Sequence, residues 1–147
     1  MKLKNEAKIE FLSYSVNESF ARMTVAAFAA QMDPTLEELG DIKTAVSEAV
    51  TNAIVHAYPN CLGKIQLRLR ISENAILEIQ VKDWGKGIEN VEQARQPLFT
   101  TGGEERSGMG FTVMESFMDS LRVRSRPGQG TVVTMKRQIS QRVGIHG

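Results

Sequence analysis

The sequence predicts a two-layer α/β sandwich in which helices cover one face of a mixed, mainly antiparallel sheet. Four segments alternate apolar and polar residues with period two, and two longer segments carry apolar stripes with helical period. Clean alternation is typical of strands that bury one face only, so the helices should lie on one side. With 147 residues and neither a repeat nor a Pro/Gly/Ser linker, residues 1–147 should form a single domain.

The first 59 residues are expected to hold an edge strand and two helices. Residues 7–14 alternate in the manner of a strand. Ser15 or Asn17 can cap a helix that runs to about Met32, where Asp33-Pro34 ends it. A second helix should begin near Thr35, because Thr35 and Glu38 have the spacing of a capping box, and should continue to Pro59.

Four further strands and two helices are expected along the rest of the chain. The strands fall at residues 65–71, 77–81, 121–124 and 131–135, with a short helix near 91–95 and a longer one at about 110–118. Between the second of these strands and the last helix, residues 83–110 are rich in glycine and carry little periodicity. We therefore look for functional residues in this glycine-rich segment and on the second helix.

Composition argues against several classes of protein. A net charge of +1 gives no overall attraction to nucleic acid or to anionic membranes. No run approaches the roughly 18 apolar residues of a membrane span, and residues 1–8 lack the apolar stretch of a signal peptide. The single cysteine, Cys61, cannot form an internal disulfide, and His56 and His146 have no metal-ligand spacing with it. We therefore expect a cytoplasmic protein without a zinc site.

The second helix carries a polar ridge apart from its apolar stripe. Glu48, Asn52 and His56 stand at i, i+4 and i+8, which rotates them by only about 80° around an α-helix. Taken alone, such a ridge is more often a solvated helix face. Asp83 shares the phase of the inward-facing residues of its strand, so its carboxylate should point at the buried layer and needs a donor there.

Two glycine clusters follow this aspartate. The first is Asp83-Trp-Gly85-Lys-Gly87, and the second, Gly108-Met-Gly110, should stand immediately before a helix start. Backbone N–H groups at a helix N-terminus suit a phosphate. Each cluster alone is more often a simple turn, and neither has the spacing of a P-loop or of a dinucleotide-binding fingerprint.

In combination these motifs resemble the GHKL superfamily of ATP-binding domains. Glu48-Ala-Val-Thr-Asn52-Ala is similar to its N box, the Asp83 cluster to its G1 box and the Gly108 cluster to its G2 box. The wider stretches at 17–22, 47–54, 94–101 and 106–111 are similar to the bacterial anti-sigma kinases of partner-switching modules, the sporulation type above all. The resemblance implies the Bergerat fold and covers nearly the whole chain.

The resemblance also implies a role for each matching residue. Asn52 would bind a Mg²⁺ ion that bridges the ATP phosphates, Asp83 would accept the adenine amino group, and Thr131 would support the adenine pocket. Gly85 and Gly87 would shape the pocket wall, His56 would reach a phosphate, and residues 100–107 would form a mobile lid with Arg106 near the phosphates. The remaining residues expected to contact ATP or ADP are Thr100, Thr101, Ser107, Gly108, Met109, Gly110 and Phe111.

Glu48 is the expected catalytic residue, since a carboxylate one turn from the metal ligand can accept a proton from an attacking serine. In the family this serine belongs to an anti-anti-sigma factor, and the kinase also holds a sigma factor of the sigma F type. Arg22, with Glu18 one turn earlier, would contact both partners, although such an arginine is more often solvated. The resemblance further implies a homodimer.

Alternatives remain for the surface and for the function. Five arginines, Arg68, Arg70, Arg122, Arg124 and Arg126, should point from the open sheet face, where a solvated face is expected before a dimer contact or a nucleic-acid patch. The chain could also be an anti-sigma kinase of a stress-response module, or a non-catalytic module whose binding ATP regulates. An assay of phosphate transfer to an anti-anti-sigma protein would separate the enzyme from the pure binder.

Overall fold

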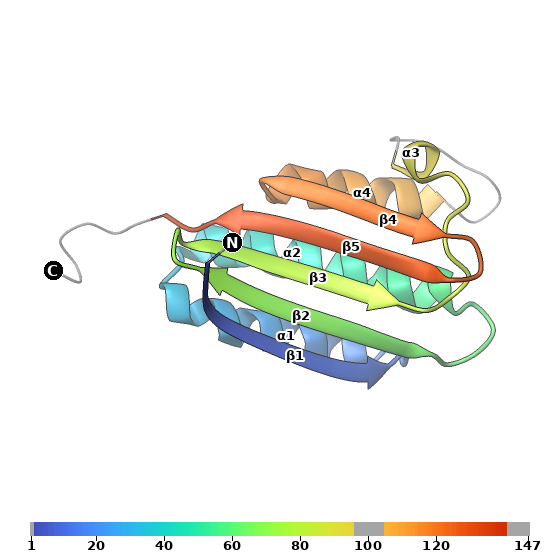
Figure 1. The fold of residues 1–147 in the computed structure, drawn as a ribbon, viewed down its shortest axis with the longest axis horizontal. Helices are drawn as coiled ribbons and strands as arrows, with labels where there is room; N and C mark the ends of the chain where they lie inside the picture. Colours follow the sequence, from blue (N-terminus) through green and yellow to red (C-terminus); the bar gives the residue numbers. More distant parts are fainter. Residues whose placement is uncertain (1, 96–104, 141–147) are drawn as a thin grey trace, which may run out of the picture.

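The computed structural model describes residues 2–95 and 105–140, and it shows one antiparallel sheet with helices on one face (Figure 1). The sheet has the strand order β1-β2-β3-β5-β4. The strands are β1 (Leu3–Leu12), β2 (Lys64–Ser72), β3 (Ile76–Asp83), β4 (Ser120–Arg126) and β5 (Gly130–Gln138). The helices are α1 (Asn17–Ala29), α2 (Leu36–Asn52), α3 (Val91–Ala94) and α4 (Glu105–Phe117). The predicted α/β sandwich is confirmed, but all four described strand pairings are antiparallel, so the sheet is not mixed.

Burial follows the alternation that predicted the strands. On the central strands β2 and β3, Leu67, Leu69, Leu77 and Ile79 are at most 1% exposed, and they pack against α2 through residues such as Ile42 and Val46. Burying one such side chain contributes about 1.5–3 kcal/mol. Helix α2 therefore lies against the middle of the sheet, between α1 and α4.

The start of α2 is set by the capping box that the sequence predicts. The Thr35 hydroxyl accepts from the Glu38 backbone N–H at 3.0 Å, while the Glu38 carboxylate accepts from the Thr35 N–H at 2.8 Å. Burial would raise the pKa of Glu38, but these donors, together with the backbone and hydroxyl of Ser140, bring it below its ordinary value. The carboxylate thus fastens the end of the described chain to α2.

The second helix does not remain α-helical to its end. After Asn52 it continues as a π-helical turn over Ala53–Ala57, and no proline explains the change. Single π-turns inside helices are frequent at functional sites because they reset the direction of the side chains that follow. Here the turn carries His56, four residues beyond Asn52.

Helix α4 begins earlier than predicted. It starts at Glu105 rather than near Gly110, so Gly108 and Gly110 lie inside its first turns and not in front of them. The prediction placed this glycine pair in front of the helix as a phosphate-binding N-terminus, and glycine in a helix interior costs about 1 kcal/mol. Packing of α4 against α2 compensates for this cost.

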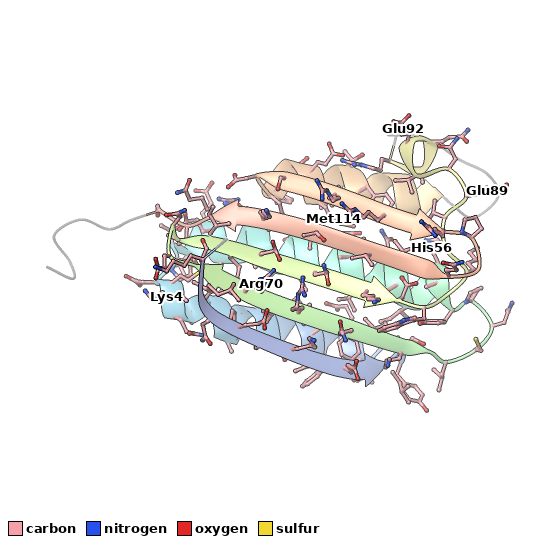
Figure 2. The ribbon with its side chains drawn as sticks, in the orientation of Figure 1. Lys4, His56, Arg70, Glu89, Glu92 and Met114 are labelled. Carbon is pink, nitrogen blue, oxygen red and sulfur yellow. The ribbon has the colours of Figure 1, made fainter. Side chains whose placement is uncertain are left out.

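The open face of the sheet carries a charge cluster rather than a simple solvated surface. Glu78 on β3 is only 7% exposed and lies near three cations, with Arg70 at 3.4 Å, Lys136 at 3.8 Å and Arg68 at 3.9 Å. Figure 2 shows Arg70 on the sheet face that the helices leave uncovered. The prediction that Arg68 and Arg70 are solvated is therefore wrong, because pairing with Glu78 half-buries them; Arg122, Arg124 and Arg126 are exposed as expected.

Within residues 2–95 and 105–140, no helix is both long enough and apolar enough to cross a membrane.

Candidate functional site

A cavity of about 720 Å³ opens at one end of the sheet, where β3 ends and β5 begins. Its floor is α2 with the following π-turn, and its walls come from β3, β5, α3, α4 and the loop between β3 and α3. Small side chains on the helix, Ala49, Ala53 and Ala57, recur every four residues and leave room for a ligand. A concave, partly apolar site with a few convergent polar groups is the usual form of a small-molecule site.

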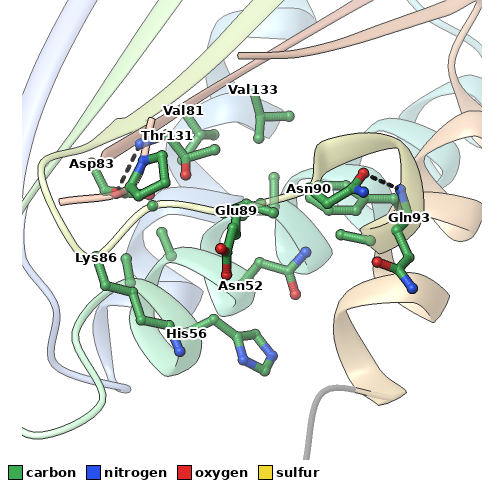
Figure 3. Close-up of a pocket in the computed structure, with 18 residues that line it drawn as sticks. Asn52, His56, Val81, Asp83, Lys86, Glu89, Asn90, Gln93, Thr131 and Val133 are labelled. Carbon is green, nitrogen blue, oxygen red and sulfur yellow. Dashed lines mark hydrogen bonds between the residues drawn. The ribbon is translucent and has the colours of Figure 1, made fainter. Parts of the chain in front are cut away.

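Asp83 is buried and lines this cavity, as its strand phase predicts. It is 6% exposed, and its Oδ1 accepts from the backbone N–H groups of Gly85 at 3.0 Å and Thr131 at 3.1 Å. Figure 3 shows the bond with Thr131. No hydrogen bond within the described residues reaches Oδ2. Burial raises the pKa of Asp83 above its ordinary value, although the two N–H donors act to lower it. The cavity thus contains a fixed carboxylate with one oxygen left to accept.

The glycines beside Asp83 are required by the backbone. Gly87 lines the cavity with φ +75°, a left-handed conformation that other residues rarely adopt, and a side chain there would meet the Arg126 backbone. Gly85 does not line the cavity; a Cβ on it would collide with the Ala57 carbonyl. Gly85 therefore brings the loop against the π-turn, and Gly87 forms part of the wall.

Asn52 and Glu48 come together with α4 at the other side of the cavity. A Cβ on Gly110 would stand 3.0 Å from Asn52 Nδ2 and 3.3 Å from Glu48 Oε2, so the glycine lets α4 approach both polar side chains. Asn52 lines the cavity and its Nδ2 is buried without a hydrogen-bond partner among the described residues. Glu48 is half-buried and does not itself line the cavity.

The structure brings six of the predicted residues to one place. Asn52, His56, Asp83, Gly87, Phe111 and Thr131 all line the cavity, and Figure 3 shows His56 and Asn52 on the same side of it. Continuous α-helical geometry was assumed for His56, whereas a π-turn carries it.

Several predicted residues cannot be placed. Thr100 and Thr101 lie outside the described residues, as does most of the predicted lid; residues 105–107 form the first turn of α4 instead. The side chains of Arg106, Ser107 and Met109 are also outside the described part, and only the backbone of Gly108 is placed, within α4.

Sequence reasoning missed four polar residues of the cavity: Lys86, Glu89, Asn90 and Gln93. Lys86 stands within the first glycine cluster, and the other three stand in the loop after it and in α3, where no periodicity marks them. Of these four, only Asn90 has a signal in the sequence, because asparagine is favoured as a helix N-cap. In the structure its side chain accepts from the Gln93 N–H at 3.0 Å and caps α3. Trp84 lies outside the cavity, between the Lys64 and Lys82 ammonium groups at 4.5 and 4.8 Å from its ring centroid.

Arg22 and Glu18 lie on α1, away from the cavity lining. The Arg22 Nε donates to Glu18 Oε2 at 3.1 Å, and their side chains are 37% and 24% exposed. These two residues therefore belong to a separate surface.

Comparison with known proteins identifies the family. A family model described as a histidine kinase-like ATPase domain matches residues 15–137. The chain belongs to the histidine kinase-like ATPase family. This confirms the GHKL resemblance, and membership of an ATPase family implies that the chain binds a nucleotide.

Within this ATPase family the chain is similar to curated relatives of nearly the same length. The "Anti-sigma F factor" of Caldanaerobacter subterraneus subsp. tengcongensis is 61% identical over 96% of this chain and 99% of its own. The "Anti-sigma F factor" of Bacillus subtilis is 52% identical over 95% of this chain and 96% of its own.

A solved structure shares the fold. The RsbU and RsbW domains of Rv1364c from Mycobacterium tuberculosis give a TM-score of 0.70 at 18% identity, over 94% of this chain and 33% of theirs. At this identity the likeness shows the histidine kinase-like ATPase fold alone.

Proposed function

We propose that this chain is an ATP-dependent serine-protein kinase that also binds and inhibits a sporulation sigma factor of the sigma F type. Its protein substrate would be a serine of an anti-anti-sigma factor, and it would act in the cytoplasm as a homodimer. The names of the 52–61% identical relatives support the anti-sigma part. The site supports the nucleotide part.

One observation carries the ATP assignment. The unpaired Oδ2 of Asp83 lies at one end of the cavity, and the unpaired amide of Asn52 lies at another part of the same cavity. An adenine amino group can donate to the carboxylate, while the phosphates extend toward Asn52 and α4. The apolar walls formed by Val81, Ile88 and Val133 suit the faces of the base.

The residues present also fit a Mg²⁺ ion that accompanies ATP. The amide oxygen of Asn52 is a hard ligand, and the Nδ2 of the same amide is buried without a partner among the described residues. In the described part of the chain, no three His, Cys, Asp or Glu side chains gather into a metal cage, so phosphates and waters would complete the coordination. When bound, Mg²⁺ supplies charge neutralisation on the phosphates.

Glu48 would act as the general base. It stands one helical turn before Asn52 and faces the same glycine of α4, so its carboxylate lies next to the place where phosphates would bind. From there it can accept the hydroxyl proton as a serine oxygen attacks the γ-phosphorus and ADP leaves. Positioning of the two reactants contributes the rest of the rate.

Incubation with radiolabelled ATP and a purified anti-anti-sigma protein tests this function. We expect label on one serine of the acceptor, and none when that serine is replaced by alanine. A chain that binds ATP tightly but transfers no label would be a regulated binding module, which would remove the kinase assignment. A pull-down with the sigma factor tests the anti-sigma part, and sedimentation tests the homodimer.

The surface around Arg22 supports partner binding. Three large apolar residues on or beside α1 are unusually exposed, with Val16 at 73%, Met23 at 56% and Phe20 at 51%. Exposed apolar groups around a half-buried arginine are typical of protein-protein contact sites. We propose that the sigma factor and the anti-anti-sigma factor compete for this surface.

Arg22→Glu is expected to weaken binding of both partners by about 10- to 100-fold, since it removes an interfacial arginine and places two acidic groups together. ATP affinity should stay unchanged, because α1 does not line the cavity. Calorimetry with each ligand measures both effects. Lys43→Glu, a charge reversal on α2, is the matched control, and an unchanged sigma affinity in Arg22→Glu would defeat the assignment.

ATP affinity is expected to fall with decreasing pH as Asp83 takes up a proton, because a protonated Oδ2 no longer accepts from the adenine amino group. Burial raises the pKa of this carboxyl, so the loss should begin above the ordinary aspartate value of about 3.9. The effect of this proton on the free energy of unfolding has the opposite sign. Because the pKa of Asp83 is raised in the folded state, protonation favours the folded state as pH falls. ATP titrations from pH 8 to pH 4.5 measure the profile, and Asp83→Asn, at its lower affinity, should lack the part of the fall that Asp83 causes.

A further inference from the structure

Ser125, outside the cavity, connects to the base end of the site through one row of residues. It stands on β4 directly opposite Thr131 of β5, which in turn stands opposite Asp83 of β3. Thr131 and Asp83 are 8% and 6% exposed and line the cavity, whereas Ser125 lies behind them. The polar side chains of Ser125, Thr131 and Asp83 thus form a row across three adjacent strands that leads into the site.

Two backbone groups contact the hydroxyl of Ser125. Its Oγ lies 2.9 Å from the Gly130 carbonyl oxygen, which carries no hydrogen and can only accept. Its Oγ also lies 2.7 Å from the Ile88 backbone nitrogen, which can only donate. Ser125 therefore receives a hydrogen bond from Ile88 and can donate its single proton to Gly130.

The third contact of Ser125 then determines the state of Thr131. The two hydroxyl oxygens are 2.7 Å apart, and by distance either could donate. In the arrangement that gives both the Gly130 carbonyl and the Ser125 oxygen a donor, Ser125 donates to Gly130 and Thr131 donates to Ser125. The Thr131 hydroxyl consequently turns only lone pairs toward the cavity, beside the unpaired Oδ2 of Asp83.

We propose that Ser125 is a specificity-determining positioning residue, which makes the base end of the cavity an acceptor-only site and so selects 6-amino purines over 6-oxo purines. This rests on the proposed ATP binding. The exocyclic amino group of adenine has two hydrogens, which directly or through a water can satisfy two acceptors. A 6-oxo purine would instead bring its own acceptor oxygen against them, which a site built for a donor rejects.

The test compares ADP with IDP, which differ only in the 6-position and the N1 proton, by calorimetry in the presence of Mg²⁺. The unmodified protein should prefer ADP. Ser125→Ala frees the Thr131 hydroxyl to donate into the cavity, so the preference for ADP should fall about tenfold, the equivalent of one hydrogen bond. Ser120→Ala on the same strand is the control, and Ser125→Thr should retain the preference.

If Ser125 only supported the fold, Ser125→Ala would change the affinities for ADP and IDP by the same factor and leave their ratio unchanged. Ser125→Ala leaves the Ile88 N–H without its acceptor, so some loss of affinity for both nucleotides is expected. In a Thr131→Val background the Ser125→Ala change should no longer alter the ratio. Should Ser125→Ala not fold, Ser125→Cys gives the same comparison, because a thiol is a poor acceptor.

The role of Ser125 would be overturned if Ser125→Ala left the ratio of ADP to IDP affinity unchanged. It would also be overturned if Ser125→Ala lowered this ratio equally in the Thr131→Val background. In both cases ADP binding itself would stand. Binding of neither nucleotide to the unmodified protein would overturn the proposed function itself, and this inference with it.

Discussion

Glu48→Gln is expected to lower phosphate transfer to the acceptor serine by about 10²- to 10⁴-fold, the usual contribution of a general base. Glutamine has nearly the same shape, so α4 should still pack at Gly110 and the cavity should keep its form. Its amide cannot take the serine proton. ATP and sigma factor affinity should therefore remain close to those of the unmodified protein while turnover is lost.

Single-turnover measurements with labelled ATP separate the chemical step from binding. Glu37→Gln, an exposed carboxylate in the first turn of the same helix, is the matched control and should keep full activity. Normal turnover in Glu48→Gln would exclude this residue from the mechanism, whatever the affinity for ATP.

Asn52→Ala is expected to weaken ATP binding by about 10- to 100-fold and to remove its dependence on Mg²⁺, because the proposed metal ligand is gone. The apo-protein should be as stable as the unmodified one, or more so by up to about 1 kcal/mol. The reason is that Asn52 Nδ2 is buried without a partner, and removing such a group removes its desolvation cost.

Two measurements check the pair of effects: calorimetry of ATP with and without Mg²⁺, and chemical denaturation without ligand. Thr51→Ala, the neighbouring position on α2, controls for the change in helix propensity. If Asn52→Ala bound Mg²⁺-ATP normally, the metal role of this residue would be disproved. A large loss of apo stability would show that Asn52 holds the fold together instead.

The features that the sequence predicted correctly depend on local rules. The Thr35 and Glu38 capping box needs only a spacing of three residues, and the inward direction of Asp83 and Thr131 needs only the period of a strand. These rules place the carboxylate, but they do not show that a cavity exists beside it. The expectation of ATP came from the resemblance, which the family match then confirmed at the level of an ATPase domain.

What the sequence did not predict depends on contacts between distant segments. Helix α4 extends through Gly108 and Gly110 because Gly110 packs against Glu48 and Asn52, which lie about sixty positions away along the chain. The π-turn after Asn52 has no proline or other local signal. The pairing that half-buries Arg68 and Arg70 requires Glu78 from the neighbouring strand β3.

Lys2 and Ser140 lie at the end of the sheet opposite the cavity. The Lys2 carbonyl accepts from Glu73 at 3.0 Å, and Ser140 donates to Glu38 at 2.8 Å. Strand β3 runs from this end to Asp83, roughly 25 Å away. If the protein were tethered to a sensor chip near Lys2 or Ser140, its nucleotide cavity and the start of α1 would face the solution. The exchange of partners could then be followed in real time, because the chip would cover neither surface.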